Sequence, residues 1–302
     1  MAGADIRFDG KVAIVTGAGG GLGEQHALEL ARRGAKVVVN DLGGAVDGKG
    51  GSSDAAQRVV AEIKAAGGEA IANGSSVTDD AGVKHMIDEA MAAWGRIDII
   101  IANAGILRDK SFSKMEISDF EAVMNVHVMG TVKPVKAAWE IMKAQNYGRI
   151  VVTTSSTGLY GNFGQANYGA AKLALVGFMN TMKLEGQKNN IHVNAISPVA
   201  ATRMTEGLMP PEVLARLKPE LVTPAVVYLA SEDAPTGTIL TAGAGAYAMA
   251  RIYETEGAYL GDDASAEAVR DHFDVIAAPE GQKAYFNGGE QGAKFFRKMA
   301  GG

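Results

Sequence analysis

The chain has no cysteine, little proline, few aromatic residues and no excess of positive charge. Its 302 residues include 8 Pro and 6% aromatic residues, and the formal net charge is −5. The absence of cysteine excludes disulfides, thiolate metal sites and a cysteine nucleophile, and it fits a reducing compartment such as the cytoplasm. The negative charge argues against general binding to nucleic acid, so we expect no nucleic-acid partner.

Long apolar runs are also missing. The longest uncharged stretch, residues 234–250, is interrupted by Pro235 and by three glycines, so it does not predict a membrane span. The first residues contain no apolar core of a secretory signal, and the last ones do not form a Ser-Lys-Leu peroxisomal address. These absences together favour a cytoplasmic protein.

Glycine is abundant, with 39 residues in no collagen-like period. The chain also contains 47% hydrophobic and 21% charged residues, which is enough apolar material for a sizeable core. This composition indicates a compact scaffold with many tight loops.

Short apolar runs alternate with longer amphipathic segments. We predict strands at residues 11–16, 36–41, 69–73, 97–102, 149–153, 191–196 and 238–241. We predict helices at residues 22–34, 53–66, 80–94, 118–144, 167–187 and 222–230. Near-continuous apolar strands that alternate with helices predict an α/β fold. The expected architecture is a doubly wound, mostly parallel, seven-stranded Rossmann-like sheet with helices on both faces.

The alternation stops after about residue 245. We therefore divide the chain into a core, residues 1–245, and a C-terminal extension, residues 246–302. The extension is expected to contain helices near residues 266–276 and 291–299. We expect it to pack on the core or across a dimer partner.

A glycine-rich turn, residues 16–23, joins the first strand to the first helix. Gly17, Gly21 and Gly23 let the backbone approach a diphosphate, and the helix N-terminus that starts near Leu22 supplies free N–H groups. This position after the first strand is where an α/β fold binds a dinucleotide. An ordinary turn between a strand and a helix is the alternative interpretation.

Asp41 ends the second predicted strand. A carboxylate at this position can accept hydrogen bonds from the adenosine ribose and would repel a 2′-phosphate. Because the glycine-rich turn contains no Arg or Lys, NAD is favoured over NADP. The alternative is that Asp41 only caps a loop.

Tyr168 and Lys172 are spaced i, i+4 on one face of a predicted helix, and Ser155 lies at the end of the fifth predicted strand. A nearby ammonium favours the phenolate and lowers the pKa of a tyrosine. Tyr168 could then take the proton of an alcohol while a hydride leaves for a nicotinamide, and Ser155 could bond the same oxygen. A Tyr-x-x-x-Lys spacing alone also arises by chance.

These motifs, together with Asn103-Ala104-Gly105, resemble the short-chain dehydrogenase/reductase family over about residues 8 to 245. The resemblance implies that Tyr168 is the catalytic acid/base, that Lys172 lowers its pKa and holds the nicotinamide ribose, and that Ser155 polarises the substrate. It further implies that Asn103 steadies the sheet beside the cofactor. The cofactor-contacting positions that it implies are Gly17, Gly21, Leu22, Gly23, Asp41, Ser76, Val77, Asn103, Ala104, Gly105, Tyr168, Lys172, Pro198 and Thr202.

A closer resemblance is to the dehydrogenase part of the peroxisomal multifunctional enzymes of type 2, also described as 17β-hydroxysteroid dehydrogenases of the fourth type. It rests on residues 39–44, 103–109, 145–149, 158–168 and 185–192. It implies oxidation of (3R)-hydroxyacyl-CoA to 3-ketoacyl-CoA with NAD, in β-oxidation or steroid side-chain degradation, by a stand-alone bacterial-type chain. The family also implies a homodimer or homotetramer.

Three positions depart from the family pattern. His127 stands where the family usually has a catalytic Asn, and Asn125 lies two residues too early to replace it. His127 either passes protons or is a structural histidine. Pro198 is followed by Val199 instead of Gly, so Thr202 matches only with a one-residue gap. Ser76 replaces the usual Asp beside the adenine.

The substrate region offers loop cations and a mobile, apolar segment. Arg108, Lys110 and Arg203 are candidates for contacts to CoA phosphates, although each could be a solvated loop charge. Residues 200–221 are expected to form a substrate lid. The apolar contacts of that lid would come from Met204, Leu208, Met209 and Leu214. Free 17β-hydroxysteroids are the alternative substrates, and a non-catalytic NAD-binding or assembly subunit is the alternative of another class.

Overall fold

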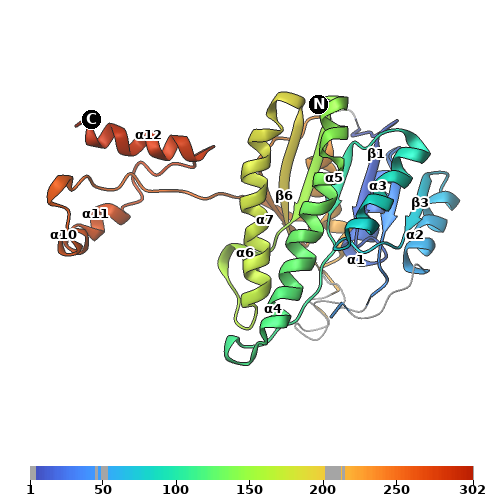
Figure 1. The fold of residues 1–302 in the computed structure, drawn as a ribbon, viewed down its shortest axis with the longest axis horizontal. Helices are drawn as coiled ribbons and strands as arrows, with labels where there is room; N and C mark the ends of the chain where they lie inside the picture. Colours follow the sequence, from blue (N-terminus) through green and yellow to red (C-terminus); the bar gives the residue numbers. More distant parts are fainter. Residues whose placement is uncertain (1–4, 45–46, 49–53, 201–211, 213–214, 302) are drawn as a thin grey trace. The chain divides into compact units, whose positions relative to one another are not determined.

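The computed structural model describes residues 5–44, 47–48, 54–200, 212 and 215–301. Within it the chain forms two compact units, Met1–Met249 and Ala250–Gly302. Figure 1 shows the α/β architecture of the first unit.

The first unit is built on one sheet with strand order β3-β2-β1-β4-β5-β6-β7-β8. All strand pairs from β3 to β7 are parallel. The strands are β1 (Val12–Thr16), β2 (Lys36–Asn40), β3 (Glu69–Asn73), β4 (Ile99–Ala102), β5 (Gly148–Thr153), β6 (Ile191–Val199), β7 (Ile239–Gly243) and β8 (Ala246–Ala250). The doubly wound α/β fold is confirmed, because the chain runs outward from β1 in both directions.

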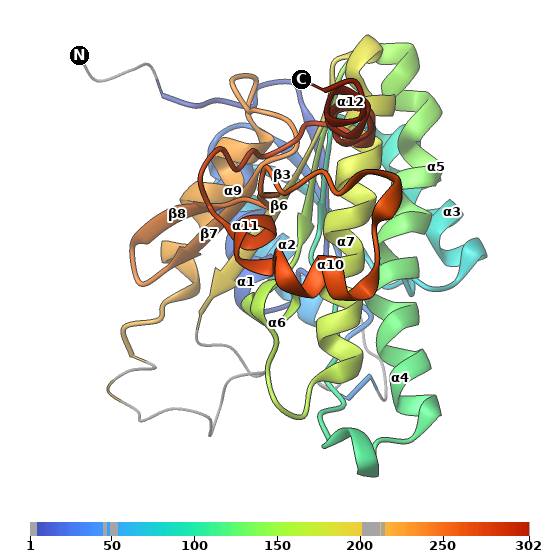
Figure 2. The same cartoon turned by 90° about the vertical axis from the view of Figure 1, so that its left-hand side faces the viewer.

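The sheet has eight strands, so the expectation of seven is wrong. β8 follows β7 after the turn formed by Ala244 and Gly245, whose φ angles are 50° and 80°. Positive φ at both central residues is typical of a two-residue hairpin turn. Four of the five residues of β8 are exposed, so this edge strand lacks the apolar run that identified the others. Figure 2 shows β8 beside β7.

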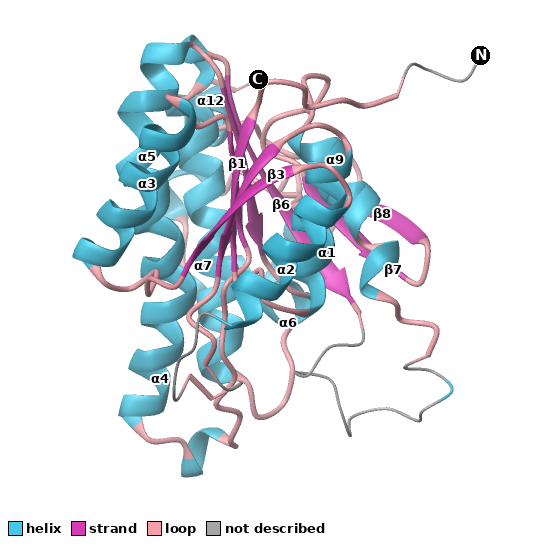
Figure 3. Cartoon of the chain, turned by 90° about the vertical axis from the view of Figure 1, so that its right-hand side faces the viewer, coloured by secondary structure: helices cyan, strands magenta, loops and turns pink. Residues whose placement is uncertain are grey.

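Helices cover both faces of the sheet, as Figure 3 shows. One face carries α1 (Gly21–Arg32), α2 (Asp54–Ala65) and α9 (Thr223–Ala230), and the other carries α3 (Asp80–Trp94), α5 (Gly130–Gln145) and α7 (Ala166–Glu185). Because both faces are covered, the central strands are apolar throughout: every residue of β1 and β4 is buried. The largest buried cluster lies between the sheet and the helices of the first face.

The predicted helix at residues 118–144 is a helical run with a defect. α4 (Ile117–Met124) passes into the π-helical segment η2 (Asn125–Met129), which passes into α5. π-Helical turns widen a helix and often occur at functional sites. Here the defect carries His127, which is buried, whereas Asn125 is exposed. A further short helix, α6 (Ser156–Tyr160), was not predicted.

The second unit contains α10 (Ala266–Asp271), α11 (Phe273–Ala277) and α12 (Gly288–Met299). The predicted helix at residues 266–276 is therefore two short helices divided at His272. Backbone bonds between Glu254 and Lys283 join two segments of this unit. Lys294, whose side chain is 3% exposed, pairs with Glu254 and donates to the carbonyl oxygen of Thr255 at 3.0 Å.

No helix in the described part of the chain is long and apolar enough to cross a membrane.

Thr16 connects the ends of β1 and β4. Substitutions of Thr16 test how much this connection stabilises the fold. Its hydroxyl oxygen accepts hydrogen bonds from the backbone N–H groups of Asn103 at 3.0 Å and Ala104 at 3.1 Å. Thr16→Val should lower the free energy of unfolding by about 2 kcal/mol or more, because it leaves both donors unpaired. Thr16→Ser, which keeps the hydroxyl, should stay much closer to the parent protein in urea unfolding. Equal losses in both variants would contradict this role.

Candidate functional site

The glycine-rich turn lies between the carboxyl end of β1 and the start of α1. Gly17 and Gly21 have φ angles of 63° and 56°. A Cβ at Gly23 would lie 2.2 Å from the carbonyl oxygen of Gly17, so only glycine fits there. Gly20 caps α1 without a side-chain hydrogen bond, and a Cβ there would meet nothing within 4 Å. The turn therefore presents uncapped N–H groups to open space, which fits a cofactor diphosphate.

Asn103 and Thr16 hold this turn against the loop that follows β4. The side-chain amide of Asn103 donates to the carbonyl oxygens of Thr16 and Gly17, each at 3.1 Å. A Cβ at Gly17 would lie 2.8 Å from the Cα of Ala104, which shows how closely the two loops approach. The predicted steadying position of Asn103 agrees with this geometry.

Asp41 follows β2, next to the glycine-rich turn. Its carboxylate accepts hydrogen bonds from the backbone N–H of Gly19 at 2.7 Å and of Gly43 at 2.6 Å. A Cβ at Gly19 would lie 2.7 Å from the Cγ of Asp41. The carboxylate therefore caps local loops and also lies beside the turn, so the two interpretations of Asp41 are compatible.

The remaining cofactor candidates differ in what the structure shows. Ser76 bonds locally, through its hydroxyl to the hydroxyl of Thr78 at 2.8 Å. Val77 is buried against Gly130, where a Cβ would lie 2.7 Å from its Cγ2. Pro198 lies within β6, which extends three residues beyond the predicted strand end and past the end of β5.

Several predicted residues lie outside the described part of the chain. These are Thr202, Arg203 and the lid residues Met204, Leu208, Met209 and Leu214.

Ser155, Tyr168 and Lys172 come together at the carboxyl end of β5. Ser155 caps α6, and its Oγ accepts from the N–H of Thr157 at 3.2 Å. Lys172 is 3% exposed, and its Nζ lies 5.5 Å from the centroid of the Tyr168 ring. Lys172 Nζ donates to the carbonyl oxygen of Thr153 at 2.6 Å, which fixes the amine beneath the ring. The three side chains thus gather at the edge where α/β folds bind ligands, with Lys172 buried and with Ser155 and Tyr168 partly exposed.

Burial shifts the pKa values of both Tyr168 and Lys172. Burial raises the pKa of Tyr168 above its ordinary value, a hydrogen bond with Ser155 lowers it, and the charge of Asp109 raises it further. Lys172 is not among the groups that shift the pKa of Tyr168, and burial lowers the pKa of Lys172 itself to about 7. A buried amine loses much of its charge near neutral pH, and with it the attraction to a phenolate.

His127 packs against the same tyrosine. The two ring centroids are 5.2 Å apart at an interplanar angle of 85°. His127 Nε2 lies 2.8 Å from the carbonyl oxygen and 3.2 Å from the backbone nitrogen of Ile106. A Cβ at Gly105 would lie 2.3 Å from Cε1 of the ring, so the histidine requires a glycine there. This geometry favours the structural interpretation of His127.

Two buried polar atoms beside this group have no partner among the described residues: His127 Nδ1 and Thr153 Oγ1. Burial also lowers the pKa of His127 well below its ordinary value, with a further contribution from Lys172. The ring is therefore neutral, and Nδ1 is available to a water or to a ligand atom.

Sequence reasoning gave no role to a polar network at the rim of the site. Gln165 donates to Asp109 at 2.6 Å and accepts from the hydroxyl of Thr157 at 2.9 Å. Asn167 is fully buried and donates to the carbonyl oxygen of Arg108 at 3.0 Å. The only signal was that all of these residues except Thr157 lie inside the stretches 103–109 and 158–168, which carry the family resemblance.

The loop cations Arg108 and Lys110 are both engaged. Their nitrogens lie 3.3 Å and 2.9 Å from the carboxylate of Asp119. Neither is a free cation for a phosphate in the described arrangement, which weakens the prediction that they bind CoA.

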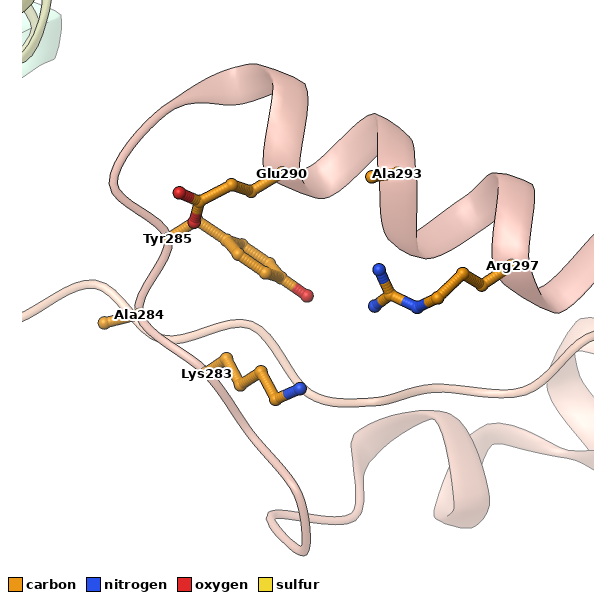
Figure 4. A pocket seen from close by; sticks show the side chains of 6 residues that line it. All are labelled: Lys283, Ala284, Tyr285, Glu290, Ala293 and Arg297. Carbon is orange, nitrogen blue, oxygen red and sulfur yellow. The ribbon is translucent and has the colours of Figure 1, made fainter. Parts of the chain in front are cut away.

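The second unit contains a surface hollow of about 360 Å³, shown in Figure 4. It is lined by Lys283, Ala284, Tyr285, Glu290, Ala293 and Arg297. All six residues belong to the extension, and none is a predicted catalytic or cofactor residue, so this hollow is not the candidate active site.

The family model for short chain dehydrogenases matches residues 11–212, and the chain belongs to this family of oxidoreductases. It is 51% identical over 272 residues to peroxisomal multifunctional enzyme A of Dictyostelium discoideum, and 49% identical over 275 residues to peroxisomal multifunctional enzyme type 2 of Mus musculus. Each match covers 90% of this chain, but only 61% and 37% of those relatives. A short-chain type dehydrogenase/reductase of Mycobacterium tuberculosis is 48% identical and is covered to 96% of its length, with 90% of this chain matched.

Solved structures agree with this membership. Full-length peroxisomal multifunctional enzyme type 2 from Drosophila melanogaster matches with a TM-score of 0.82 and 38% identity, over 98% of this chain and 50% of that one. A 7α-hydroxysteroid dehydrogenase in complex with NADH and 7-oxo glycochenodeoxycholic acid matches with a TM-score of 0.71 and 30% identity, over 79% of this chain and 95% of that one.

The buried lysine predicts a pH dependence of stability. Between about pH 7 and pH 10 the unfolded chain binds a proton at Lys172 that the folded chain does not hold. Relative to Lys172→Met, the parent protein should therefore gain about 1.4 kcal/mol of unfolding free energy per pH unit in this window. Below about pH 7 both states hold the proton, so the difference should be constant there.

Urea unfolding across this pH range measures the effect. Lys84→Met, which removes an exposed lysine paired with Asp88, is the control and should show no such slope. A pH-independent difference between Lys172→Met and the parent would show that the folded state keeps the ammonium charged.

Proposed function

We propose that this chain oxidises the 3-hydroxyl group of a (3R)-hydroxyacyl-CoA to a ketone, with NAD as the hydride acceptor. The observation that carries the proposal is the convergence of Ser155, Tyr168 and the buried Lys172 on the sheet edge that also carries the glycine-rich turn. The substrate class comes from the similarity to peroxisomal multifunctional enzymes, which extends over 90% of the chain. A role in β-oxidation or in steroid side-chain degradation follows from that class.

Ser155, Tyr168 and Lys172 have different roles in the proposed reaction. Ser155 Oγ, held at the start of α6, donates a hydrogen bond to the substrate oxygen. Tyr168 takes the hydroxyl proton of the substrate, and Lys172, fixed by the carbonyl of Thr153, supplies positive charge in its protonated fraction. NAD, when bound, accepts the hydride from the carbinol carbon. The glycine-rich turn would hold its diphosphate, and Asp41 its adenosine ribose.

A panel of substrates tests the proposal. NAD reduction would be measured with (3R)- and (3S)-hydroxyacyl-CoAs of several chain lengths, with CoA esters of a steroid side chain and with free 17β-hydroxysteroids. Oxidation of the (3R)-acyl-CoAs supports the proposal. Turnover of free steroids alone would replace it with the hydroxysteroid alternative, which the similarity to a 7α-hydroxysteroid dehydrogenase favours. No turnover of any alcohol would favour a non-catalytic NAD-binding or assembly subunit.

Replacing the proposed acid/base gives a sharper test. Tyr168→Phe removes one hydroxyl and should reduce kcat by about 10²-fold or more, because it removes the group that is proposed to take the proton. NAD should still bind, as measured by calorimetry, since the glycine-rich turn is untouched. Tyr160→Phe, at an exposed tyrosine, is the matched control. Retained turnover in Tyr168→Phe would exclude this tyrosine as the base.

Asp41 sets the expected cofactor preference. Asp41→Ala removes the charge that would repel a 2′-phosphate, so the ratio of kcat/KM for NAD to that for NADP should fall about tenfold. Glu62→Gln, at an exposed carboxylate of α2, controls for the change in net charge. An unchanged ratio in Asp41→Ala would show that Asp41 only caps its loop.

We also propose that the extension packs on the core or on a second copy in a homodimer or homotetramer. Among its described residues only Lys294 is buried, so the extension has no apolar core of its own. Large apolar side chains such as Phe273, Phe296 and Met299 are more than half exposed. A segment of this kind needs a surface that covers it. Sedimentation velocity of the full chain measures the assembly, and a monomer would leave only the core as that surface.

A further inference from the structure

Asp109 is a fixed carboxylate at the rim of the site. It lies in the loop after β4 and accepts a hydrogen bond from Gln165 Nε2 at 2.6 Å. The backbone next to it is held by a bond from the N–H of Lys110 to the carbonyl oxygen of Gly164 at 2.9 Å. Gln165 continues the network to Thr157, whose N–H bonds the Oγ of Ser155. The carboxylate therefore has a defined place relative to the catalytic hydroxyls.

The charge of Asp109 is not neutralised by the described residues. The adjacent cations, Arg108 and Lys110, are both paired with Asp119 instead. Asp109 also acts on the catalytic tyrosine, because its negative charge raises the pKa of Tyr168. The other groups facing that phenol are Ser155, the neutral ring of His127 and the amine of Lys172.

This arrangement distinguishes substrates by their charge near the reacting carbon. In a 3-hydroxy acid the carboxylate carbon is two bonds from the carbinol carbon, and the carbinol oxygen contacts Tyr168. The charge of Asp109, which acts on Tyr168, would therefore also act on a charge at that position. A free acid would bring a second negative charge there, whereas a thioester is neutral, and like charges at this range repel.

We propose that Asp109 is a specificity-determining residue that rejects anionic groups next to the carbinol carbon, so that neutral thioesters react and free 3-hydroxy acids do not. The inference rests on the proposed function. It explains why a carboxylate without a counter-ion among the described residues stands at the rim of a site whose substrate carries its phosphates at the far end. Gln165 is the positioning residue that holds the carboxylate in place.

The experiment compares two substrates that differ only at this group: a free (3R)-hydroxy acid and its N-acetylcysteamine thioester, which has no CoA phosphates. Asp109→Asn keeps an oxygen acceptor for Gln165 and removes the charge. The kcat/KM ratio of thioester to free acid should fall about five- to tenfold in this variant, as for removal of one partly solvated charge. Asp88→Asn, at an exposed carboxylate paired with Lys84, should leave the ratio unchanged.

The pH dependence of kcat/KM distinguishes an electrostatic effect of Asp109 from a steric one. Because Asp109 raises the pKa of Tyr168, Asp109→Asn should move the acid limb of kcat/KM for the thioester to lower pH. A loss of rate for both substrates without a change in their ratio or in the limb would overturn the proposal and leave Asp109 a structural role. Should the variant not fold, added salt tests the unmodified protein, in which screening should raise kcat/KM for the free acid relative to the thioester.

Different results would contradict the proposed function and the proposed role of Asp109. If the unmodified protein oxidises no acyl thioester but does oxidise a neutral steroid alcohol, the proposed function is wrong. The acid limb of kcat/KM for that steroid would then be compared between Asp109→Asn and the unmodified protein. A shift of this limb would still show that Asp109 acts on Tyr168. If the thioester reacts and the ratio does not change, only the role of Asp109 is wrong.

Discussion

The hydrogen bonds of Thr16 and Asn103 are the contacts on which the arrangement of the site depends. β1 and β4 are neighbours in the sheet, and their carboxyl ends carry the glycine-rich turn and the loop toward Asp109. The hydroxyl of Thr16 and the amide of Asn103 use four hydrogen bonds to hold these two loops together. Because the loops approach within van der Waals contact at Gly17 and Ala104, a shift of either one displaces both the cofactor turn and the substrate rim.

A second constraint is the burial of the catalytic group. His127 and Lys172 are buried beside the partly exposed Tyr168, and burial lowers the pKa of both bases and raises that of the phenol. Near pH 7 the ring of His127 is therefore neutral, whereas Lys172, with a pKa of about 7, is charged in part of the molecules. The π-helical segment places His127 in this group, and Gly105 leaves room for its ring. In this arrangement Ser155 and the rim carboxylate of Asp109 are the polar groups that a substrate would meet at the edge of the site.

Much of the fold could be predicted from the sequence because a parallel sheet covered on both faces leaves a strong local pattern. Strands such as β1 and β4 are buried throughout and appear as apolar runs, and helices such as α3 show apolar residues at helical spacing. β8 has no such pattern because it is an exposed edge strand. The helix over residues 118–144 was predicted, but its π-helical defect was not, because the side-chain spacing of one wide turn differs too little from that of an α-helix.

The sequence by itself determined the fold class and located the glycine-rich turn and the residues Ser155, Tyr168 and Lys172, because each leaves a motif of fixed spacing along the chain. Only the tertiary structure decided how they act together. It placed Lys172 in a buried position that lowers its pKa, engaged Arg108 and Lys110 with Asp119, and gave Asp109 no counter-ion within the part of the chain that it describes. Such properties depend on burial and on partners from distant segments, and local spacing carries no record of either.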